Sequence, residues 1–383
     1  MKIEPFGVEL WMNEFENRCT HNLAETCVES ITVAELLELT GHLHSSIEEI
    51  LPFKLTYGAI EGSGRLRSAI AALYATQSSG NILVTHGTIS ANALVHQTLV
   101  SLGDRVVAVV PTYQQHYSIP ESIGAEVKQV TLRPENSFLP DLDELRAAVT
   151  QETKLIAITN PNNPTGSLMQ RELLEEVVSI ARAADAWILC DEVYRGSNQH
   201  GSGTTESMAD LYEKGISTAS MSKVYSMAGL RLGWIAAPQS LIEQLMIHRD
   251  YNTISVGLLN DHFACLALES SDVMLQRSRD ITRTNLSILS DWVDSEPLMS
   301  WVKPKAGTTA LLQYDFDISS RDLCVDIIEQ TGVMFTPGSA LLMEGSIRVG
   351  FANNTESLRT GLALVSQYLA DKSYLKISQL KSV

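Results

Sequence analysis

Short apolar runs alternate with helical segments along most of this 383-residue chain. We expect strands within residues 81–87, 104–111, 126–132, 153–161, 186–194, 215–222 and 231–238. Helical spacing of apolar residues falls between them, within 64–75, 89–101, 139–149 and 170–185, and Pro140 with Asp141 makes a good start for the third of these helices. Strands that are apolar throughout, with helices between them, are typical of a mainly parallel sheet covered on both faces. The pattern therefore predicts an α/β fold.

The pattern changes near Ser271. A long helix is expected within 272–293, half-exposed strands within 298–314, a helix within 320–332, a strand within 346–352 and a last helix within 355–369. We interpret this part as a smaller α+β domain, formed by residues 1–35 and 271–383, beside a large ligand-binding domain of residues 36–270. The mixed tail, 371–383, is expected to be disordered.

Charge and composition exclude several classes of function. The net charge of −17 leaves no basic stripe for a nucleic acid, so we expect no nucleic-acid partner. We find neither an apolar run long enough to span a membrane nor a signal-peptide core. The five cysteines are scattered without a CxxC pair, which favours a reducing cytoplasm and indicates neither a disulfide framework nor a metal site.

Ligands of parallel α/β sheets bind in the loops that follow the strands. The first such loop places Gly87 and Thr88 at a helix start, where free N–H groups and the helix dipole favour an anion such as phosphate. A plain turn is the alternative. The next loop presents Tyr113, which either stacks on a flat ligand or packs on its neighbours at the rim.

Two further loops carry polar groups at strand ends. The stretch "TNPNNPTG" forces a rigid turn that either fixes the amide of Asn163 as a donor or uses asparagine for backbone reasons. Asp191 emerges from an apolar strand, where a carboxylate needs either backbone donors or a cation such as a protonated ring nitrogen. Tyr194, three residues later, can place its hydroxyl beside the same ring.

The stretch "SMSKVYSMAGLRLG" holds the most reactive candidate. We expect desolvation and cationic neighbours to lower the pKa of the Lys223 amine and make it nucleophilic. Ser220, Ser222 and Arg231 can bind a dianionic phosphate. Two glycines, Gly229 and Gly233, are expected to let the backbone approach closely.

Together these loops predict a pocket for pyridoxal 5'-phosphate. It would combine a Lys223 Schiff base, Asp191 on the pyridinium nitrogen and a phosphate cup. From about Tyr57 to residue 352, the motifs "NPNNPTG", "DEVY", "SMSK" and "GLRLGW" and their spacing resemble the class I/II aminotransferases, of fold type I. The resemblance implies that Lys223 also shuttles the substrate proton.

The resemblance implies further roles. Asn163 and Tyr194 would bind the cofactor's 3'-oxygen, and Tyr113 would stack on its ring. Arg348 would clamp the substrate carboxylate, with Asn163 beside it. Tyr57 would reach the phosphate of a neighbouring subunit, which makes the active unit a homodimer.

The resulting prediction is an aminotransferase that acts on an α-amino acid and a 2-oxo acid by a ping-pong mechanism. A β-eliminating C–S lyase or a cyclising enzyme of the capreomycidine-synthase type would share the same residues. A cofactor-sensing regulatory domain is a third alternative, although the chain has no room before Tyr57 for the helix-turn-helix usual in that class. Arg195 and Arg249 are weak candidates for a second substrate-facing arginine, and packing is the expected role of Trp11.

Overall fold

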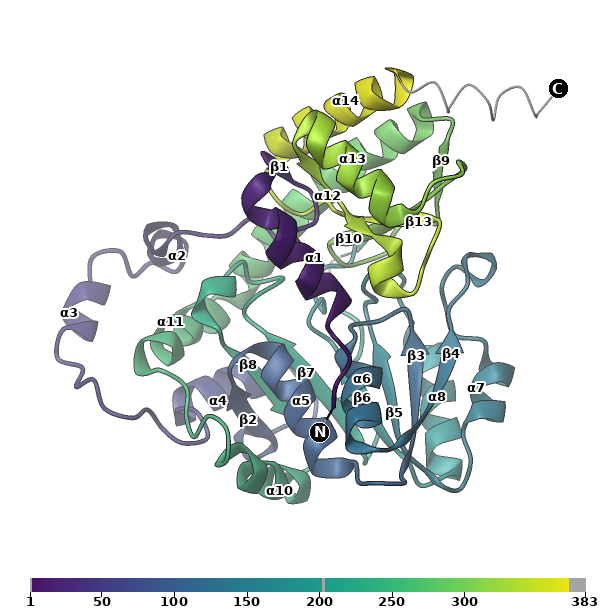
Figure 1. The fold of residues 1–383 in the computed structure, drawn as a ribbon. Helices are drawn as coiled ribbons and strands as arrows, with labels where there is room; N and C mark the ends of the chain where they lie inside the picture. Colours follow the sequence, from purple (N-terminus) through teal and green to yellow (C-terminus); the bar gives the residue numbers. More distant parts are fainter. Residues whose placement is uncertain (1, 202–203, 372–383) are drawn as a thin grey trace.

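The computed structural model describes residues 2–201 and 204–371, so the predicted disordered tail lies outside this range except for its first residue. A seven-stranded sheet forms the lower part of the molecule in Figure 1, in the order β2-β8-β7-β6-β5-β3-β4. Its strands are β2 (Ile82–Thr85), β3 (Arg105–Val110), β4 (Glu126–Thr131), β5 (Thr153–Thr159), β6 (Trp187–Asp191), β7 (Gly215–Ser220) and β8 (Gly233–Ala236). Strand β8 runs opposite to the other six strands of this sheet, which all point the same way, and this confirms the mainly parallel α/β fold.

Both faces of this sheet are covered, which explains why its strands are apolar throughout. Leu155 and Leu189 pack toward α5 and α10, whereas their neighbours Ile156 and Ile188 pack toward α7 and α8 on the other face. The helices of this part are α4 (Gly64–Ala71), α5 (Gly87–Leu99), α6 (Gln115–Ile123), α7 (Leu142–Ala148), α8 (Arg171–Ala183), α9 (Met208–Leu211), α10 (Gln239–Arg249) and α11 (Leu258–Glu269). Asp141 caps α7 as expected, because its Oδ1 accepts the N–H groups of Asp143 and Glu144.

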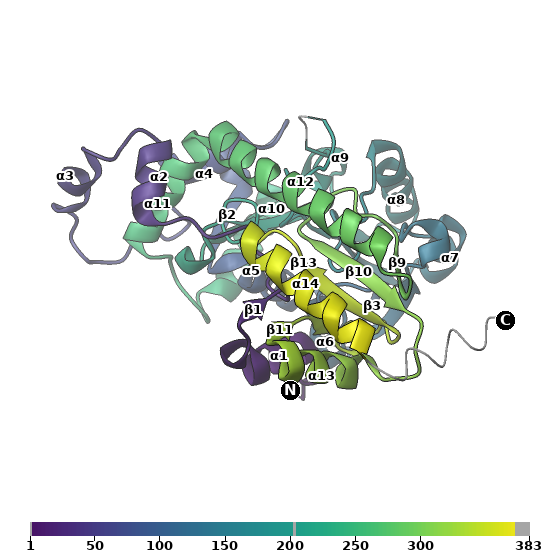
Figure 2. The same ribbon diagram turned by 90° about the horizontal axis from the view of Figure 1, so that it is seen from above.

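A second unit is built mainly from the end of the chain. Its four-stranded sheet has the order β12-β13-β10-β9, with β9 (Met299–Trp301), β10 (Thr309–Tyr314), β12 (Thr336–Pro337) and β13 (Ser346–Gly350). Its helices are α12 (Ser271–Ser295), α13 (Ser320–Thr331) and α14 (Thr355–Asp371), and α12 and α14 lie side by side on its outer surface (Figure 2). The prediction of half-exposed strands is wrong for β10: Leu311 faces the core of the large sheet and Leu312 the core of the second unit.

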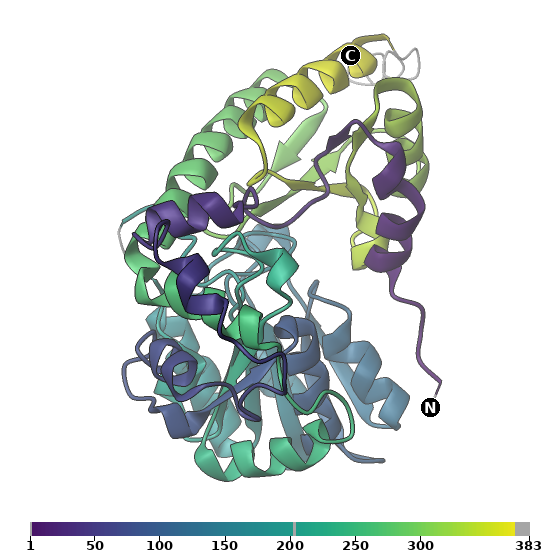
Figure 3. The ribbon, with the colours of Figure 1, turned by 90° about the vertical axis from the view of Figure 1, so that its left-hand side faces the viewer.

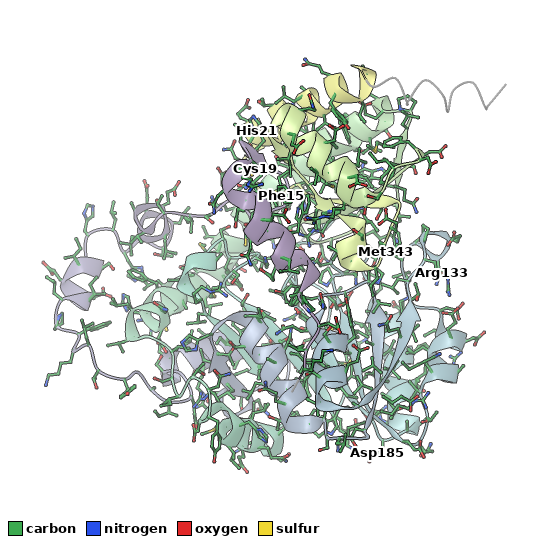
Figure 4. The ribbon with its side chains drawn as sticks, in the orientation of Figure 1. Phe15, Cys19, His21, Arg133, Asp185 and Met343 are labelled. Atoms are coloured by element: carbon green, nitrogen blue, oxygen red, sulfur yellow. The ribbon has the colours of Figure 1, made fainter. Side chains whose placement is uncertain are left out.

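The N-terminal segment joins this second unit across more than 300 residues of sequence. Strand β1 (His21–Asn22) pairs in parallel with β11 (Val333–Met334), and helix α1 (Gly7–Phe15) buries Trp11 and Phe15 in the same core as α13. Figure 3 shows this segment rising along the large sheet to reach the second unit, and Figure 4 places Phe15, Cys19 and His21 beside that unit. The domain boundary near residue 270 stays a prediction.

Helices α2 (Val33–Leu39) and α3 (Ser46–Ile50) belong to an arm that projects sideways from the body (Figure 1). Thr32 begins α2 with a capping box, because its hydroxyl accepts the N–H of Glu35 while the Glu35 carboxylate accepts the N–H of Thr32. Beyond α2 the arm exposes several large apolar side chains, among them Leu51 and Leu55.

Candidate active site

A cavity of about 380 Å³ opens where the carboxyl ends of the parallel strands face the N-terminal segment. Ten of the predicted site residues line it: Thr88, Tyr113, Asn163, Asp191, Tyr194, Ser220, Ser222, Lys223, Arg231 and Arg348. The strand order explains this convergence. Strands β3, β5, β6 and β7 all end at this edge, and the antiparallel β8 begins there, so that Arg231 directly before β8 arrives at the same place.

A larger cavity of about 720 Å³ lies beside the first one and shares Val193 and Ser220 with it. Its lining holds Glu192 and Arg195 but neither Lys223, Asp191 nor Arg348. The smaller cavity is therefore the one that brings the predicted catalytic and substrate-binding residues together.

The amine of Lys223 contacts the N-terminal segment inside the cavity. Its Nζ donates to Oγ1 of Thr26 over 2.5 Å and lies 3.5 Å from Sγ of Cys27. Our expectation of a lowered pKa is wrong for this amine. Burial does lower the pKa of Lys223, but the adjacent Cys27 thiol, the phenol of Tyr194 and the carboxylate of Glu25 outweigh it, so that the pKa is raised.

Asp191 is held in one orientation from several sides. Its Oδ1 accepts the N–H of Val193 over 3.1 Å, and its Oδ2 accepts Nδ2 of Asn92 over 2.8 Å. The Nε2 atom of His116 lies 3.8 Å from the same Oδ2. The carboxylate is thus satisfied by protein donors and also lines the cavity, so that it can serve a cationic ring nitrogen there.

The start of α5 has features that suit the predicted anion site. Gly87 adopts a φ of +75°, which places it in the left-handed region, and the hydroxyl of Thr88 is buried without a partner in the described part of the chain. Arg231 adjoins this site, because a Cβ added to Gly87 would lie 3.2 Å from its Nη2. Ser220 and Ser222 line the same end of the cavity.

One of the two glycines predicted to permit close approach does so. A Cβ on Gly233 would lie 2.5 Å from the carbonyl carbon of Gly87 and 2.7 Å from the backbone nitrogen of Thr88. An added Cβ on Gly229 would meet no described atom within 4 Å, so the expectation for this glycine stays a prediction.

Three polar side chains complete the wall. Tyr113 donates its hydroxyl to Oε1 of Glu9 over 2.9 Å, and its ring packs 4.7 Å from the ring of Phe6. Tyr194 is buried at 2% exposure. Asn163, which lines the cavity, accepts a hydrogen bond from Nη1 of Arg348 through its Oδ1 over 3.3 Å.

Arg348 is buried at 3% exposure, which makes its charge costly without an anion. Its Nη2 donates to the carbonyl of Ala24 over 3.1 Å and to the hydroxyl of Thr336 over 3.0 Å. Its Nε has no hydrogen-bond partner among residues 2–201 and 204–371. Burial lowers the pKa of this guanidinium, although Tyr194 and Glu25 oppose that effect.

Residues 52–363 match the family model described as aminotransferase class I and II. The chain belongs to this family.

Three known proteins resemble this aminotransferase chain in sequence or structure over most of its length. A crystal structure of a PLP-dependent aminotransferase from Streptococcus suis is 40% identical, covers 97% of this chain and 100% of its own, and superposes with a TM-score of 0.94. Capreomycidine synthase of Streptomyces vinaceus is 30% identical over 94% of this chain and 93% of its own length. Arginine–pyruvate transaminase AruH of Pseudomonas aeruginosa is 26% identical over 83% of each chain.

Pyridoxal phosphate is the cofactor of this aminotransferase, and the cavity fits it. The phosphate would be held by the hydroxyl of Thr88, which has no hydrogen-bond partner in the described part of the chain, by the backbone brought close at Gly233, and by Arg231. Asp191 would pair with a cationic ring nitrogen, and Lys223 would bind an aldehyde.

Tyr57 lies outside this arrangement. It is 77% exposed and does not line the cavity of its own chain. Arg195 donates to the carbonyls of Thr205 and Leu73, and Arg249 is buried at 2% exposure outside the cavity. Neither forms part of this cavity, while Trp11 packs in the core and donates its Nε1 to the carbonyl of Phe335, as expected.

Sequence reasoning missed part of the aminotransferase cavity. Asn92 lies one turn after Thr88 on α5, and a polar residue on that buried helix was an available signal. The N-terminal segment offered no comparable signal. It supplies the lining residues Val8, Glu9, Met12, Asn13, Glu16, Ala24, Glu25, Thr26 and Cys27.

Two further observations concern other classes of site. Within the described ranges, no helix is both long and apolar enough to cross a membrane. Nor do those ranges contain a cluster of three or more His, Cys, Asp or Glu side chains that could hold a metal ion.

Proposed function

We propose that the protein transfers an amino group between an α-amino acid and a 2-oxo acid by a ping-pong mechanism. The observation that carries the proposal is that Lys223, Asp191 and Arg348 line one cavity, although they come from the loop after β7, the end of β6 and strand β13. Bound pyridoxal phosphate supplies an aldehyde for amines and a ring that accepts the electrons left at the substrate Cα.

Several residues of the chain then have separate roles in the reaction. Lys223 attaches the cofactor and, once released, its Nζ accepts the Cα proton of the amino acid. The hydroxyl of Thr26, only 2.5 Å from that Nζ, holds the amine in place. Asp191 keeps the ring nitrogen of the cofactor protonated. Asn163 and Tyr194 bind the cofactor's 3'-oxygen by hydrogen bonds, and Tyr113 stacks on the ring.

Arg348 binds the substrate carboxylate in this proposal. Its Nε is buried and unpartnered within the described ranges, and Asn163 accepts from its Nη1. A carboxylate at this guanidinium would supply the missing anion and fix the Cα near Lys223.

We propose a homodimer as the active unit, located in the cytoplasm. The arm exposes Leu55 at 87% and Tyr57 at 77%, and Tyr251 beyond α10 is 93% exposed. Gly58 lies against Val256, since its added Cβ would be 2.9 Å from that carbonyl oxygen, so the two exposed stretches adjoin. Such an apolar surface favours a second copy of the chain, and all five cysteines are free, which suits a reducing compartment.

Subunit mixing tests this dimer. Lys223→Ala and Tyr57→Ala chains are each expected to be almost inactive alone. Mixed and allowed to exchange, they should regain activity, because one of the two sites in a mixed dimer would carry neither defect. No recovery despite proven exchange would contradict the crossing of Tyr57.

A second candidate is a cyclising enzyme like capreomycidine synthase. The relative of that name is 30% identical over 94% of this chain, and the same site residues would serve either outcome.

One experiment separates the two candidates. The cofactor-loaded protein is mixed with a pool of amino acids without any oxo acid, and products are followed by mass spectrometry together with ammonia. One equivalent of 2-oxo acid per site, followed by a stop, is the result we expect for transamination. Continuous turnover to a cyclised product, or steady ammonia release, would overturn it.

A further inference from the structure

One wall of the cavity is acidic and comes entirely from the N-terminal segment. Glu9, Met12, Asn13 and Glu16 line it and follow the spacing i, i+3, i+4, i+7. This spacing places them on one helical face of α1 and the 3₁₀ turn after it. Glu25 adds a third carboxylate where the segment passes Lys223.

The opposite face of the same helix explains why this wall stays in place. Trp11 and Phe15 anchor α1 in the core of the second unit, and Trp11 also donates to the carbonyl of Phe335 over 2.8 Å. The acidic face is therefore held against the cavity by packing that does not involve the acids themselves.

Two of the carboxylates are oriented by neighbouring donors. Glu9 accepts the hydroxyl of Tyr113 at its Oε1. Glu25 accepts the N–H groups of Thr26 and Cys27 over 2.7 and 2.9 Å, again through Oε1. Both carboxylates are thereby held at the cavity, which they line.

The cations of the cavity already have partners in the proposed function. Lys223, Arg231 and Arg348 are the lysine and arginine residues that line it in the described part of the chain. They would serve the cofactor aldehyde, the phosphate and the substrate carboxylate. An acidic substrate side chain would find no free cation and would face three carboxylates instead.

The buried, unpartnered Nε of Arg348 and hydroxyl of Thr88 are independent signs that ligands occupy this cavity. With the carboxylate of an amino acid at Arg348 and its amine at Lys223, the side chain must extend along a remaining wall. The wall formed by α1 carries negative charge over about 10 Å between Glu9 and Glu16, because seven residues rise 1.5 Å each in a helix.

We propose that the amino donor carries a cationic group, an ammonium or a guanidinium, at the end of its side chain, and that Glu9, Glu16 and Glu25 bind that group. The proposal rests on the proposed transaminase function, since it uses the same orientation of the substrate. Charge complementarity of this kind sets specificity more than total affinity.

Binding is tested first, on the cofactor-loaded protein by calorimetry, with ligands that lack an amine and so cannot react. 5-Guanidinopentanoate and 5-ureidopentanoate have nearly the same shape but differ in charge. We expect the guanidino compound to bind at least about tenfold more tightly, as hydrogen bonds to charged groups contribute enough for such a factor. The preference should shrink in 0.5 M salt.

Matched variants test which carboxylates cause the tighter binding of the guanidino compound. Glu9→Gln, Glu16→Gln and Glu25→Gln remove a charge while keeping an acceptor oxygen, and each should reduce the guanidino preference severalfold. Glu14→Gln is the control, because Glu14 lies on the same helix but pairs with Arg321 and does not line the cavity. Equal binding of the two ligands, or an equal effect of the control, would overturn the proposal.

A second measurement keeps this outcome separate from the proposed function. The first half-reaction is followed with L-arginine against L-citrulline and with L-lysine against L-norleucine, by the 2-oxo acid formed. Conversion of all four at similar rates would overturn the cationic preference and leave transamination standing. Conversion of none, together with tight guanidino binding, would overturn transamination and keep the acidic subsite.

Discussion

Asn92 donates its side-chain Nδ2 to Oδ2 of Asp191 over 2.8 Å, and its own Oδ1 accepts the hydroxyl of Thr218 over 2.7 Å. All three side chains are buried. The chain of donors runs from β7 through α5 to the end of β6 and so ties the carboxylate to the centre of the sheet. A buried chain of this kind fixes the direction of its last member.

We expect Asn92→Ala to weaken cofactor binding and turnover by roughly 10- to 100-fold, as a hydrogen bond to a charged group contributes about 1.5–3 kcal/mol. Thr218→Val should have a smaller effect. In the Asn92→Ala background it should have almost none, because the intermediate link is already absent. Additive losses in cofactor dissociation constants would show that the two contacts are independent.

Lys223→Ala should abolish covalent attachment of the cofactor and reduce turnover by at least 10²- to 10⁴-fold, the usual contribution of a positioned proton carrier. Borohydride reduction followed by mass spectrometry measures the attachment, and peptide mapping locates it. Attachment to another lysine, or retained activity, would contradict the assignment.

Arg348→Ala should weaken amino-acid binding far more than cofactor binding. The arginine donates to Asn163 and to the carbonyl of Ala24, whereas the predicted phosphate-binding residue Arg231 adjoins Gly87 at the start of α5. Calorimetry with a carboxylate ligand and a separate titration with pyridoxal phosphate give the two constants. An equal loss in both would mean that Arg348 supports the whole cavity and does not bind the substrate.

Gly233→Ala should lower cofactor affinity and stability, because the new Cβ would press within 2.5–2.7 Å of the backbone at Gly87 and Thr88. Displacing these atoms shifts the N–H groups of the anion site. Gly229→Ala is the matched control, since its Cβ would have open space in the described structure. Thermal unfolding and phosphate binding should be affected by the first substitution and spared by the second.

Glu25 makes stability depend on pH in the cofactor-free protein. Burial raises the pKa of this carboxyl, but the charge of Lys223 and the N–H groups of Cys27 and Thr26 outweigh burial, so that the folded pKa is lowered. A lowered folded pKa contributes stability above the ordinary value of about 4.3, and this contribution is lost as the pH falls through the folded pKa.

Glu25→Gln should therefore reduce the free energy of unfolding near pH 7, and the difference from the wild type should shrink once the pH falls below about 4.3 and disappear below the folded pKa. Urea unfolding from pH 3 to 7 measures it. A difference that grows toward acid would show that the carboxyl is destabilised in the fold.

The large sheet and the loops at its edge were predictable because each signal is local. An apolar strand such as β6 is read from its own residues, and Asp191 stands directly at its end. Helices such as α10, with buried Arg249, and α6, with an internal Pro120, escaped prediction because their residues contradict the helical pattern.

The substrate side of the cavity was not predictable from local pattern. Glu9 looks like any acidic residue of a surface helix until Tyr113, more than 100 positions later, is found to donate to it. The raised pKa of Lys223 likewise depends on Cys27 and Glu25, almost 200 residues earlier in the chain. Contacts between residues so far apart in sequence are set by how the two units pack together, so local sequence pattern does not reveal them.

The parallel pairing of β1 with β11 also has a consequence for biosynthesis. The residues that form the acidic wall leave the ribosome before the rest of the cavity, yet Trp11 and the carbonyl of Ala24 find their partners, Phe335 and Arg348, only 324 positions downstream in each case. A nascent chain can thus complete the strands of its large sheet while the wall of its cavity is still missing. The enzyme completes its substrate cavity only after its large sheet, with residues that were synthesised before that sheet.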